Sequence, residues 1–152
     1  IIALATAGRR SGLTAEKGSC FRDNRMESIY RNILWVDCLG AILTGILLAA
    51  LSGYIAPIYS LPQSWVIAHA CVHLTYGAYS FSLAVRRTRP LGLISTLAIA
   101  NASWAVLCII FAARIVEGDS VLAAAHFLIE GIYVGTLGFI EWNRREVLAK
   151  YE

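Results

Sequence analysis

Long apolar segments separated by short polar gaps dominate the chain after residue 32. They cover residues 33–56, 64–85, 91–113 and 120–142. A helix needs about 20 predominantly apolar residues to cross the hydrocarbon core of a bilayer, and each segment meets that length. Because an open sheet leaves backbone groups without partners in lipid, these segments are predicted to be helices. The pattern therefore predicts an all-α, polytopic membrane protein.

The gaps contain residues that end or begin helices. In chain order these are Pro57, Pro62, Pro90 and the run Gly118-Asp119-Ser120. Proline lacks the N–H that a helix interior needs, and Asp or Ser is favoured as the first capping residue of a helix. Connections this short make consecutive helices antiparallel neighbours, so we predict an up-down-up-down four-helix transmembrane bundle.

The basic residues predict the orientation. All but one of the 13 lysines and arginines precede the first segment, lie between the second and third, or follow the fourth; the exception is Arg114. Basic residues collect on the cytoplasmic side of membrane helices, so both termini are predicted to be cytoplasmic. We expect a multi-pass protein of the cell inner (cytoplasmic) membrane, with the lipid bilayer as partner and no nucleic acid.

Composition agrees with a membrane protein and excludes several other classes. The chain is 58% hydrophobic and 15% charged, whereas an average soluble domain is roughly 45–50% apolar and about 25% charged. A disordered chain, a disulfide-stapled miniprotein and an ordinary soluble enzyme are therefore excluded. No Cys-x-x-Cys pair is present, so the cysteines within the segments are expected to be buried as small apolar side chains.

The polar N-terminal residues differ from the rest of the chain. The only methionine is Met26, and residues 1–25 show no long apolar run. We therefore expect residues 1–25 to be a polar leader that is either not native or disordered, although a trimmed chain that lost its initiator would look the same. Residues 26–152 are predicted to form a single four-helix membrane domain.

All three histidines lie inside apolar segments, where an ionisable side chain costs about 2.5–3.5 kcal/mol to insert. They belong to two similar motifs in the second and fourth segments, His69-x3-His73-x2-Tyr76 and His126-x3-Glu130-x2-Tyr133. Each motif covers an arc of only about 60° on its helix. In a four-helix bundle the second and fourth helices are diagonal partners, so we predict that the motifs face each other, with Asn101 and Thr44 closing the site.

Three roles are open for this predicted polar site. The first, which we expect, is a structural or accessory membrane component whose polar side chains hydrogen-bond across helices, with no cofactor. The second is a small proton-linked transporter or sensor that uses the His/Glu site. The third is a metal or haem site, because imidazole is a ligand for zinc, copper, iron and nickel; the candidate ligands are His69, His73, His126 and Glu130. No catalytic constellation is present, so an enzyme is the least supported class.

Two carboxylates lie nearer the predicted cytoplasmic surface. Asp37 is about one turn inside the first segment, and Glu141 is at the end of the fourth. Side chains near helix ends can reach the interface or pair there with arginine, so we expect these carboxylates to have a structural role at the interface and not a part in transport. The candidate partners are Arg31, Arg144 and Arg145.

Three glycines share one face of the fourth segment, roughly opposite the His126/Glu130 stripe: Gly131, Gly135 and Gly138. Small residues four positions apart let helix backbones approach closely. This face is predicted to pack against the first or third helix, or to form a homodimer or part of a larger membrane complex.

Several local patterns carry a resemblance. They are Leu34-Trp35-Val36-Asp37, Asn101-x2-Trp104, the arginine-rich middle loop and Glu141-Trp142-x-Arg144-Arg145. On these residues the chain resembles the uncharacterised small four-helix integral membrane proteins of bacteria, over about residues 26–149. The resemblance implies the bundle architecture and no particular activity. The chain is also similar in span count to small multidrug-resistance transporters, but those carry a membrane glutamate in the first span, where this chain has Asp37 close to the inner surface.

Overall fold

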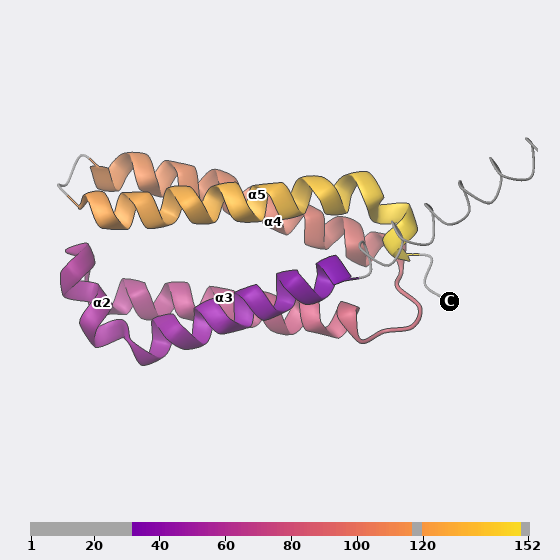
Figure 1. The fold of residues 1–152 in the computed structure, drawn as a ribbon, viewed down its shortest axis with the longest axis horizontal. Helices are drawn as coiled ribbons and strands as arrows, with labels where there is room; N and C mark the ends of the chain where they lie inside the picture. Colours follow the sequence, from indigo (N-terminus) through magenta and orange to yellow (C-terminus); the bar gives the residue numbers. More distant parts are fainter. Residues whose placement is uncertain (1–31, 117–119, 150–152) are drawn as a thin grey trace, which may run out of the picture. The chain divides into compact units, whose positions relative to one another are not determined.

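The computed structural model describes residues 32–116 and 120–149, and every secondary-structure element in these ranges is a helix (Figure 1). The first helix covers Asn32–Ala50. The others are α2 (Ser52–Tyr59), α3 (Gln63–Ala84), α4 (Leu91–Val116) and α5 (Val121–Ala149). The described residues from Ile33 onward form one compact unit. The all-α prediction is therefore confirmed for the described residues, and the predicted leader, residues 1–25, lies outside them.

Three of the described helices are long and apolar enough to cross a membrane. They are Asn32–Ala50, Leu91–Ile115 and Val121–Ala149. The second predicted segment does form a helix, α3, which has 22 residues. It is not among the three because it carries two histidines and several hydroxyl side chains, which make it less apolar.

The first predicted segment is not one continuous helix, so the prediction of a single helix over residues 33–56 is wrong. The helix breaks at Leu51, and the short α2 follows, with Pro57 inside it and not in a gap. Ser52 and Gly53 at the break have low helix propensity, which explains why the helix interrupts there. α2 ends at Tyr59, because the next residue, Ser60, has a left-handed φ of 54° that stops the helix.

Two glycines allow the first helix and α3 to pack closely. A Cβ atom on Gly77 would lie 2.6 Å from the side chain of Ile42, and one on Gly45 would lie 2.8 Å from the side chain of Leu74. Only a residue without a side chain fits at such a separation. These contacts fix the rotation of α3, and with it the direction in which the histidines point.

The predicted glycine face of α5 packs against α4, which lies beside it (Figure 1). A Cβ atom on Gly138 would lie 2.9 Å from Cβ of Asn101, and one on Gly131 would lie 3.1 Å from Cβ of Cys108. A Cβ atom on Gly135 would lie 3.3 Å from Cβ of Ala105, which also belongs to α4. The structure thus shows this glycine face packed against another helix of the same chain, which is one of the roles predicted for it.

Arg89 ties the connection between α3 and α4 to the ends of two helices. Its guanidinium group is buried and donates hydrogen bonds to the carbonyl oxygens of Leu83 (2.8 Å) and Ala84 (3.0 Å) at the end of α3. It also reaches the carbonyl oxygen of Leu148 on α5, at 3.5 Å. The last carbonyl groups of a helix lack a partner in a following turn, so the arginine adds hydrogen bonds at this helix end, where the carbonyl oxygen of Leu83 also accepts the backbone N–H of Arg86.

Candidate functional site

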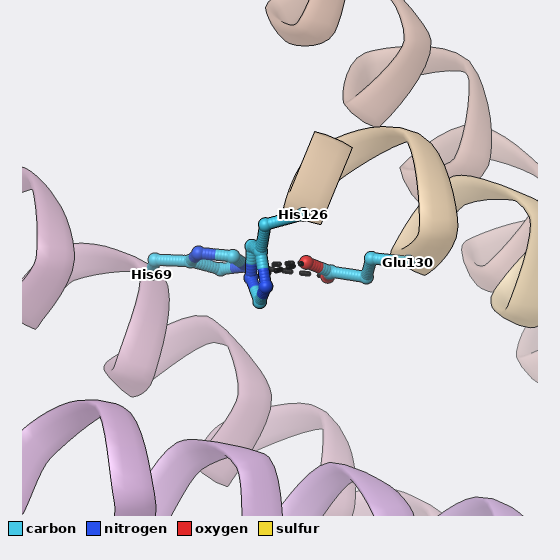
Figure 2. A group of neighbouring side chains, drawn as sticks. All are labelled: His69, His126 and Glu130. Atoms are coloured by element: carbon cyan, nitrogen blue, oxygen red, sulfur yellow. Dashed lines mark hydrogen bonds and ion pairs between the residues drawn. The ribbon is translucent and has the colours of Figure 1, made fainter. Parts of the chain in front are cut away.

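His69 of α3 and His126 of α5 meet at the carboxylate group of Glu130, which also belongs to α5 (Figure 2). Nε2 of His69 lies 3.1 Å from Oε2 of Glu130, and Nε2 of His126 lies 3.4 Å from the same oxygen. Nε2 of His73 lies 2.9 Å from the other oxygen, Oε1. Glu130 is only 8% exposed. The structure thus brings together the four predicted ligand residues of the two motifs.

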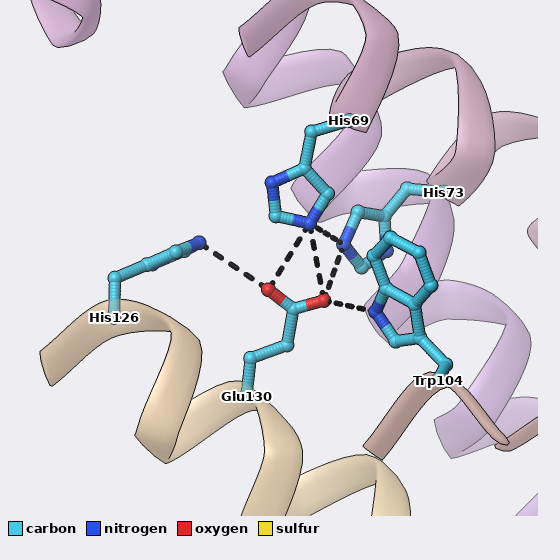
Figure 3. A network of polar contacts seen from close by, with 5 residues as sticks. All are labelled: His69, His73, Trp104, His126 and Glu130. Atoms are coloured by element: carbon cyan, nitrogen blue, oxygen red, sulfur yellow. Dashed lines mark hydrogen bonds and ion pairs between the residues drawn. The ribbon is translucent and has the colours of Figure 1, made fainter. Parts of the chain in front are cut away.

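Trp104 adds a contact from a third helix. Its indole N–H donates a hydrogen bond to Oε1 of Glu130 (Figure 3). We call these five residues the histidine site: His69, His73, Trp104, His126 and Glu130. The spacing Asn101-x2-Trp104 was noted in the sequence, but a tryptophan in the middle of a helix is usually a packing residue, so its contact with Glu130 was not predicted.

Aromatic rings hold two of the imidazoles in place. The ring of Phe127 stacks on His69 with centroids 5.1 Å apart and an interplanar angle of 12°. Trp104 contacts the same imidazole at 5.5 Å, and the ring of Tyr59 lies 5.5 Å from His126. A side chain packed in this way keeps one rotamer, which is what a site of fixed geometry needs.

The two oxygens of Glu130 have different surroundings. Oε1 accepts the hydrogen bond from Trp104 and lies 2.9 Å from Nε2 of His73 and 3.2 Å from Nε2 of His69. These two imidazole nitrogens are themselves 3.0 Å apart. Oε2 is buried and has no hydrogen-bond partner among the described residues, and the same is true of Nε2 of His126. These two atoms face each other at 3.4 Å without the geometry of a hydrogen bond. A buried polar atom left without a partner costs about 1–3 kcal/mol.

A metal ion would give both atoms a partner. One ligand atom each from His69, His126 and Glu130 lie within 4.8 Å of one another. A tetrahedral ion that binds nitrogen and oxygen at about 2.0–2.1 Å separates neighbouring ligand atoms by about 3.3 Å. The distances from Oε2 of Glu130 to the two imidazole nitrogens, 3.1 and 3.4 Å, bracket that separation. Two imidazoles and one carboxylate form a ligand set that suits Zn²⁺ and Fe²⁺.

A second group of polar side chains lies beyond the histidine site. We call it the Asp37 cluster: Asp37, Tyr76, Ser80, Asn101 and Glu141. Oδ2 of Asp37 accepts hydrogen bonds from the hydroxyl groups of Tyr76 (2.7 Å) and Ser80 (2.6 Å). Nδ2 of Asn101 donates to Oε2 of Glu141 at 2.9 Å. The cluster joins residues from four helices.

The Asp37 cluster corrects the prediction for the two carboxylates. Asp37 is 2% exposed and Glu141 is 0% exposed, so both carboxylates are buried inside the protein. The hydrogen bonds that hold them come from the hydroxyl and amide groups of α3 and α4. Arg145, one predicted partner, instead lies over the ring of Trp142 at 4.4 Å. Arg31, another predicted partner, lies outside the described residues.

Three further predicted site residues have their hydrogen-bond partners away from the histidines. Tyr76 and Asn101 belong to the Asp37 cluster. Tyr133 is 43% exposed, and its hydroxyl group donates to the carbonyl oxygen of Val36 at 3.4 Å. The contact of Ser80 with Asp37 was not predicted. The spacing could have indicated that Ser80 points inward, because it lies seven residues after His73 and so on the same face of α3.

A cavity of about 410 Å³ joins the two polar groups. His73, Trp104, His126 and Glu130 line it at the histidine site, and Asp37, Tyr76 and Asn101 line it at the Asp37 cluster. The side chain of Thr44, which was predicted to close the site, also lines the cavity. A smaller cavity of about 230 Å³ lies next to His69 and is bordered by aromatic rings that include Tyr59 and Phe127.

No family model, no curated protein and no solved structure matches this chain. Its function must therefore be inferred from the chemistry of the histidine site, the Asp37 cluster and the cavity that joins them.

Proposed function

We propose that the protein crosses the bacterial inner membrane as an up-down-up-down four-helix bundle with both termini in the cytoplasm. The first crossing is the helix Asn32–Ala50 together with α2, and α3, α4 and α5 are the others. At 1.5 Å per residue a helix of the length of α3 extends about 33 Å, enough to cross the hydrocarbon core. Its polar side chains His73 and Ser80 are buried, which supports a place for α3 inside such a bundle.

We further propose that the protein binds one transition-metal ion within the membrane, with Zn²⁺ and Fe²⁺ as the ions that suit the ligands. The ligand atoms are Nε2 of His69, Nε2 of His126 and Oε2 of Glu130. The observation that carries this proposal is that Oε2 of Glu130 and Nε2 of His126 are buried and unpartnered while facing each other at 3.4 Å.

The remaining residues of the histidine site have a supporting role. Trp104 and His73 occupy Oε1 of Glu130, which leaves Oε2 directed at the ion. Groups that orient a metal ligand in this way raise its affinity for the metal and fix its geometry. Three protein ligands leave at least one coordination position for an outside molecule, as in metal sites that act on a substrate. His126 and Glu130 line the larger cavity, so that position is next to a space that such a molecule can enter.

Elemental analysis of the detergent-purified protein tests this proposal. The protein is stripped with a chelator, dialysed separately against Zn²⁺ and Fe²⁺ without oxygen, and passed through a desalting column. We expect one ion per chain for the wild type and for the Glu146→Gln variant, which changes an exposed glutamate of the same helix. Glu130→Gln and His126→Ala are expected to retain less than about a tenth of that amount, because each removes one of three ligands.

The contradicting result is a folded wild-type protein that retains no ion, or variants that retain as much ion as the wild type. Size-exclusion profiles distinguish a lost site from a lost fold. A folded protein without metal would favour the structural or accessory role that the sequence first predicts.

A further inference from the structure

The cavity between the histidine site and the Asp37 cluster has the properties of a ligand pocket. Pockets that bind small molecules usually measure about 300–1,000 Å³ and are mostly apolar with a few well-placed polar groups. The cavity of about 410 Å³ falls in this range, and apolar side chains make up much of its lining: Ala41, Val72, Ala100, Leu107 and Val134.

Polar groups lie at both ends of this apolar space. Two helices each place one residue at each end of the cavity. Of these, His73 on α3 and Trp104 on α4 lie at the histidine site, and Tyr76 on α3 and Asn101 on α4 lie at the Asp37 cluster. Three residues of a helix advance about 4.5 Å along its axis, so the polar groups at the two ends differ in height by about the separation of two oxygens on opposite sides of a six-membered ring. A fitting ligand therefore has a ring-sized apolar body with a hydrogen-bonding group at opposite sides.

Each end offers both donors and acceptors. At the Asp37 cluster the amide of Asn101 has two N–H donors, of which the hydrogen bond to Glu141 uses one, and Asp37 is an acceptor. At the histidine site the imidazoles can donate or accept, and Glu130 accepts. A ring oxygen that is a carbonyl in one state and a hydroxyl in another is therefore matched in both states. Quinones and hydroquinones have two such oxygens, on opposite sides of one ring.

The rim of the cavity indicates how such a molecule enters. Val72, Leu107 and Ile129 line the cavity, and their side chains are also exposed on the outside of the helices. In the bundle proposed above, these apolar side chains face the lipid. A ligand would therefore arrive from the bilayer, where isoprenoid quinones are dissolved with their apolar tails.

We propose that this cavity binds the head group of a lipid-soluble quinone or hydroquinone, with one ring oxygen near Glu130 and the other near Asp37 and Asn101. The inference depends on the proposed membrane location of the protein. It does not depend on the metal ion, because the two polar ends and the apolar walls are formed by the chain alone.

Tryptophan fluorescence measures this binding, because Trp104 lines the cavity and quinones quench indole emission. The metal-free protein in detergent is titrated with decylubiquinone, and separately with its reduced form. The cavity is blocked with Ala100→Phe, and the matched control is Ala113→Phe, which adds the same ring at an exposed position of α4. We expect saturable quenching for wild type and control, and binding at least about tenfold weaker for Ala100→Phe.

A second variant and a competitor keep the test informative if Ala100→Phe does not fold. Tyr76→Phe removes one hydroxyl group at the Asp37 cluster and is expected to weaken binding about threefold to tenfold. Decanol carries the same apolar tail without the ring and is expected not to compete. Equal quenching in wild type and both variants, or displacement by decanol, would overturn the proposal. Because the protein is metal-free throughout, neither result depends on whether the metal site exists.

Discussion

The indole N–H of Trp104 donates a hydrogen bond to Oε1 of Glu130, so α4 holds a carboxylate that belongs to α5. The same oxygen lies 2.9 Å from Nε2 of His73 on α3. With one oxygen held from two sides, the carboxylate cannot rotate freely, and its other oxygen stays directed at His69 and His126 (Figure 3). The orientation of the proposed metal ligand is therefore set by the packing of three helices.

Replacement of Trp104 by phenylalanine tests this dependence. The variant keeps an aromatic ring but loses the donor to Glu130, so we expect metal affinity to fall about 10–100-fold, as is usual when a group that orients a metal ligand is lost. Affinity is measured by competition with a chelator of known affinity. Trp65→Phe is the control, because Trp65 is exposed and contacts Phe111 instead. Unchanged affinity in Trp104→Phe would show that the hydrogen bond does not orient the ligand.

Gly138→Ala is expected to loosen the packing of α4 and α5. The added Cβ would lie 2.9 Å from Cβ of Asn101 and 3.0 Å from the carbonyl oxygen of Ala98, so the helices must separate. We expect a loss of about 1–3 kcal/mol in the free energy of unfolding, measured by denaturant titration in detergent. Gly92→Ala is the matched control, since its Cβ would meet nothing within 4 Å. Equal stability of the two variants would contradict the close packing seen here.

Arg89→Ala is expected to destabilise the junction of α3, α4 and α5. It removes the hydrogen bonds to the carbonyl oxygens of Leu83, Ala84 and Leu148. Leu83 keeps the backbone N–H of Arg86 as a partner, at 3.3 Å, while the carbonyl groups of Ala84 and Leu148 lose one. A loss of about 1–3 kcal/mol in the free energy of unfolding follows from the cost of such groups. Arg87→Ala, at an exposed position of the same loop, should change stability by less than about 0.5 kcal/mol. A similar effect of both variants would mean that only the charge of the loop matters.

The hydrogen bond between Asn101 and Glu141 predicts energetic coupling between these residues. Asn101→Ala removes the partner of Oε2 in a side chain whose Oε1 already has no partner among the described residues. The single substitution should therefore be more harmful in the wild type than in a Glu141→Leu background. A double-mutant cycle measured by denaturant titration is expected to give a coupling energy of about 0.5–3 kcal/mol. A coupling energy of zero would exclude a stabilising contact.

The histidine site shows what spacing along one helix can predict. The helical period is fixed, so the intervals His69 to His73 and His126 to Glu130 place each pair on one face and at matched depths. The two pairs of residues meet when both of these helix faces point toward the interior of the protein. The close contacts of Gly45 and Gly77 with the opposite helix bring this about for α3.

The Asp37 cluster shows what spacing cannot predict. The depth of Asp37 and Glu141 along their helices suggested a place near the surface, but depth does not say which way a side chain points. Their partners Tyr76, Ser80 and Asn101 lie on other helices, 39, 43 and 40 residues away along the chain. Such pairings depend on the rotation of each helix. The break at Leu51 was missed for a related reason, since apolar residues continue on both sides of it.

X-ray absorption at the metal edge tests the proposed metal site most directly. The protein is loaded with one equivalent of Zn²⁺, and the scattering from its first and outer shells is compared with that of Glu130→Gln. The account predicts nitrogen and oxygen neighbours at about 2.0–2.1 Å with the outer-shell signature of two imidazole rings, and loss of that signature in the variant. A spectrum without imidazole scattering, or one that Glu130→Gln leaves unchanged, would contradict a metal ion held by His69, His126 and Glu130.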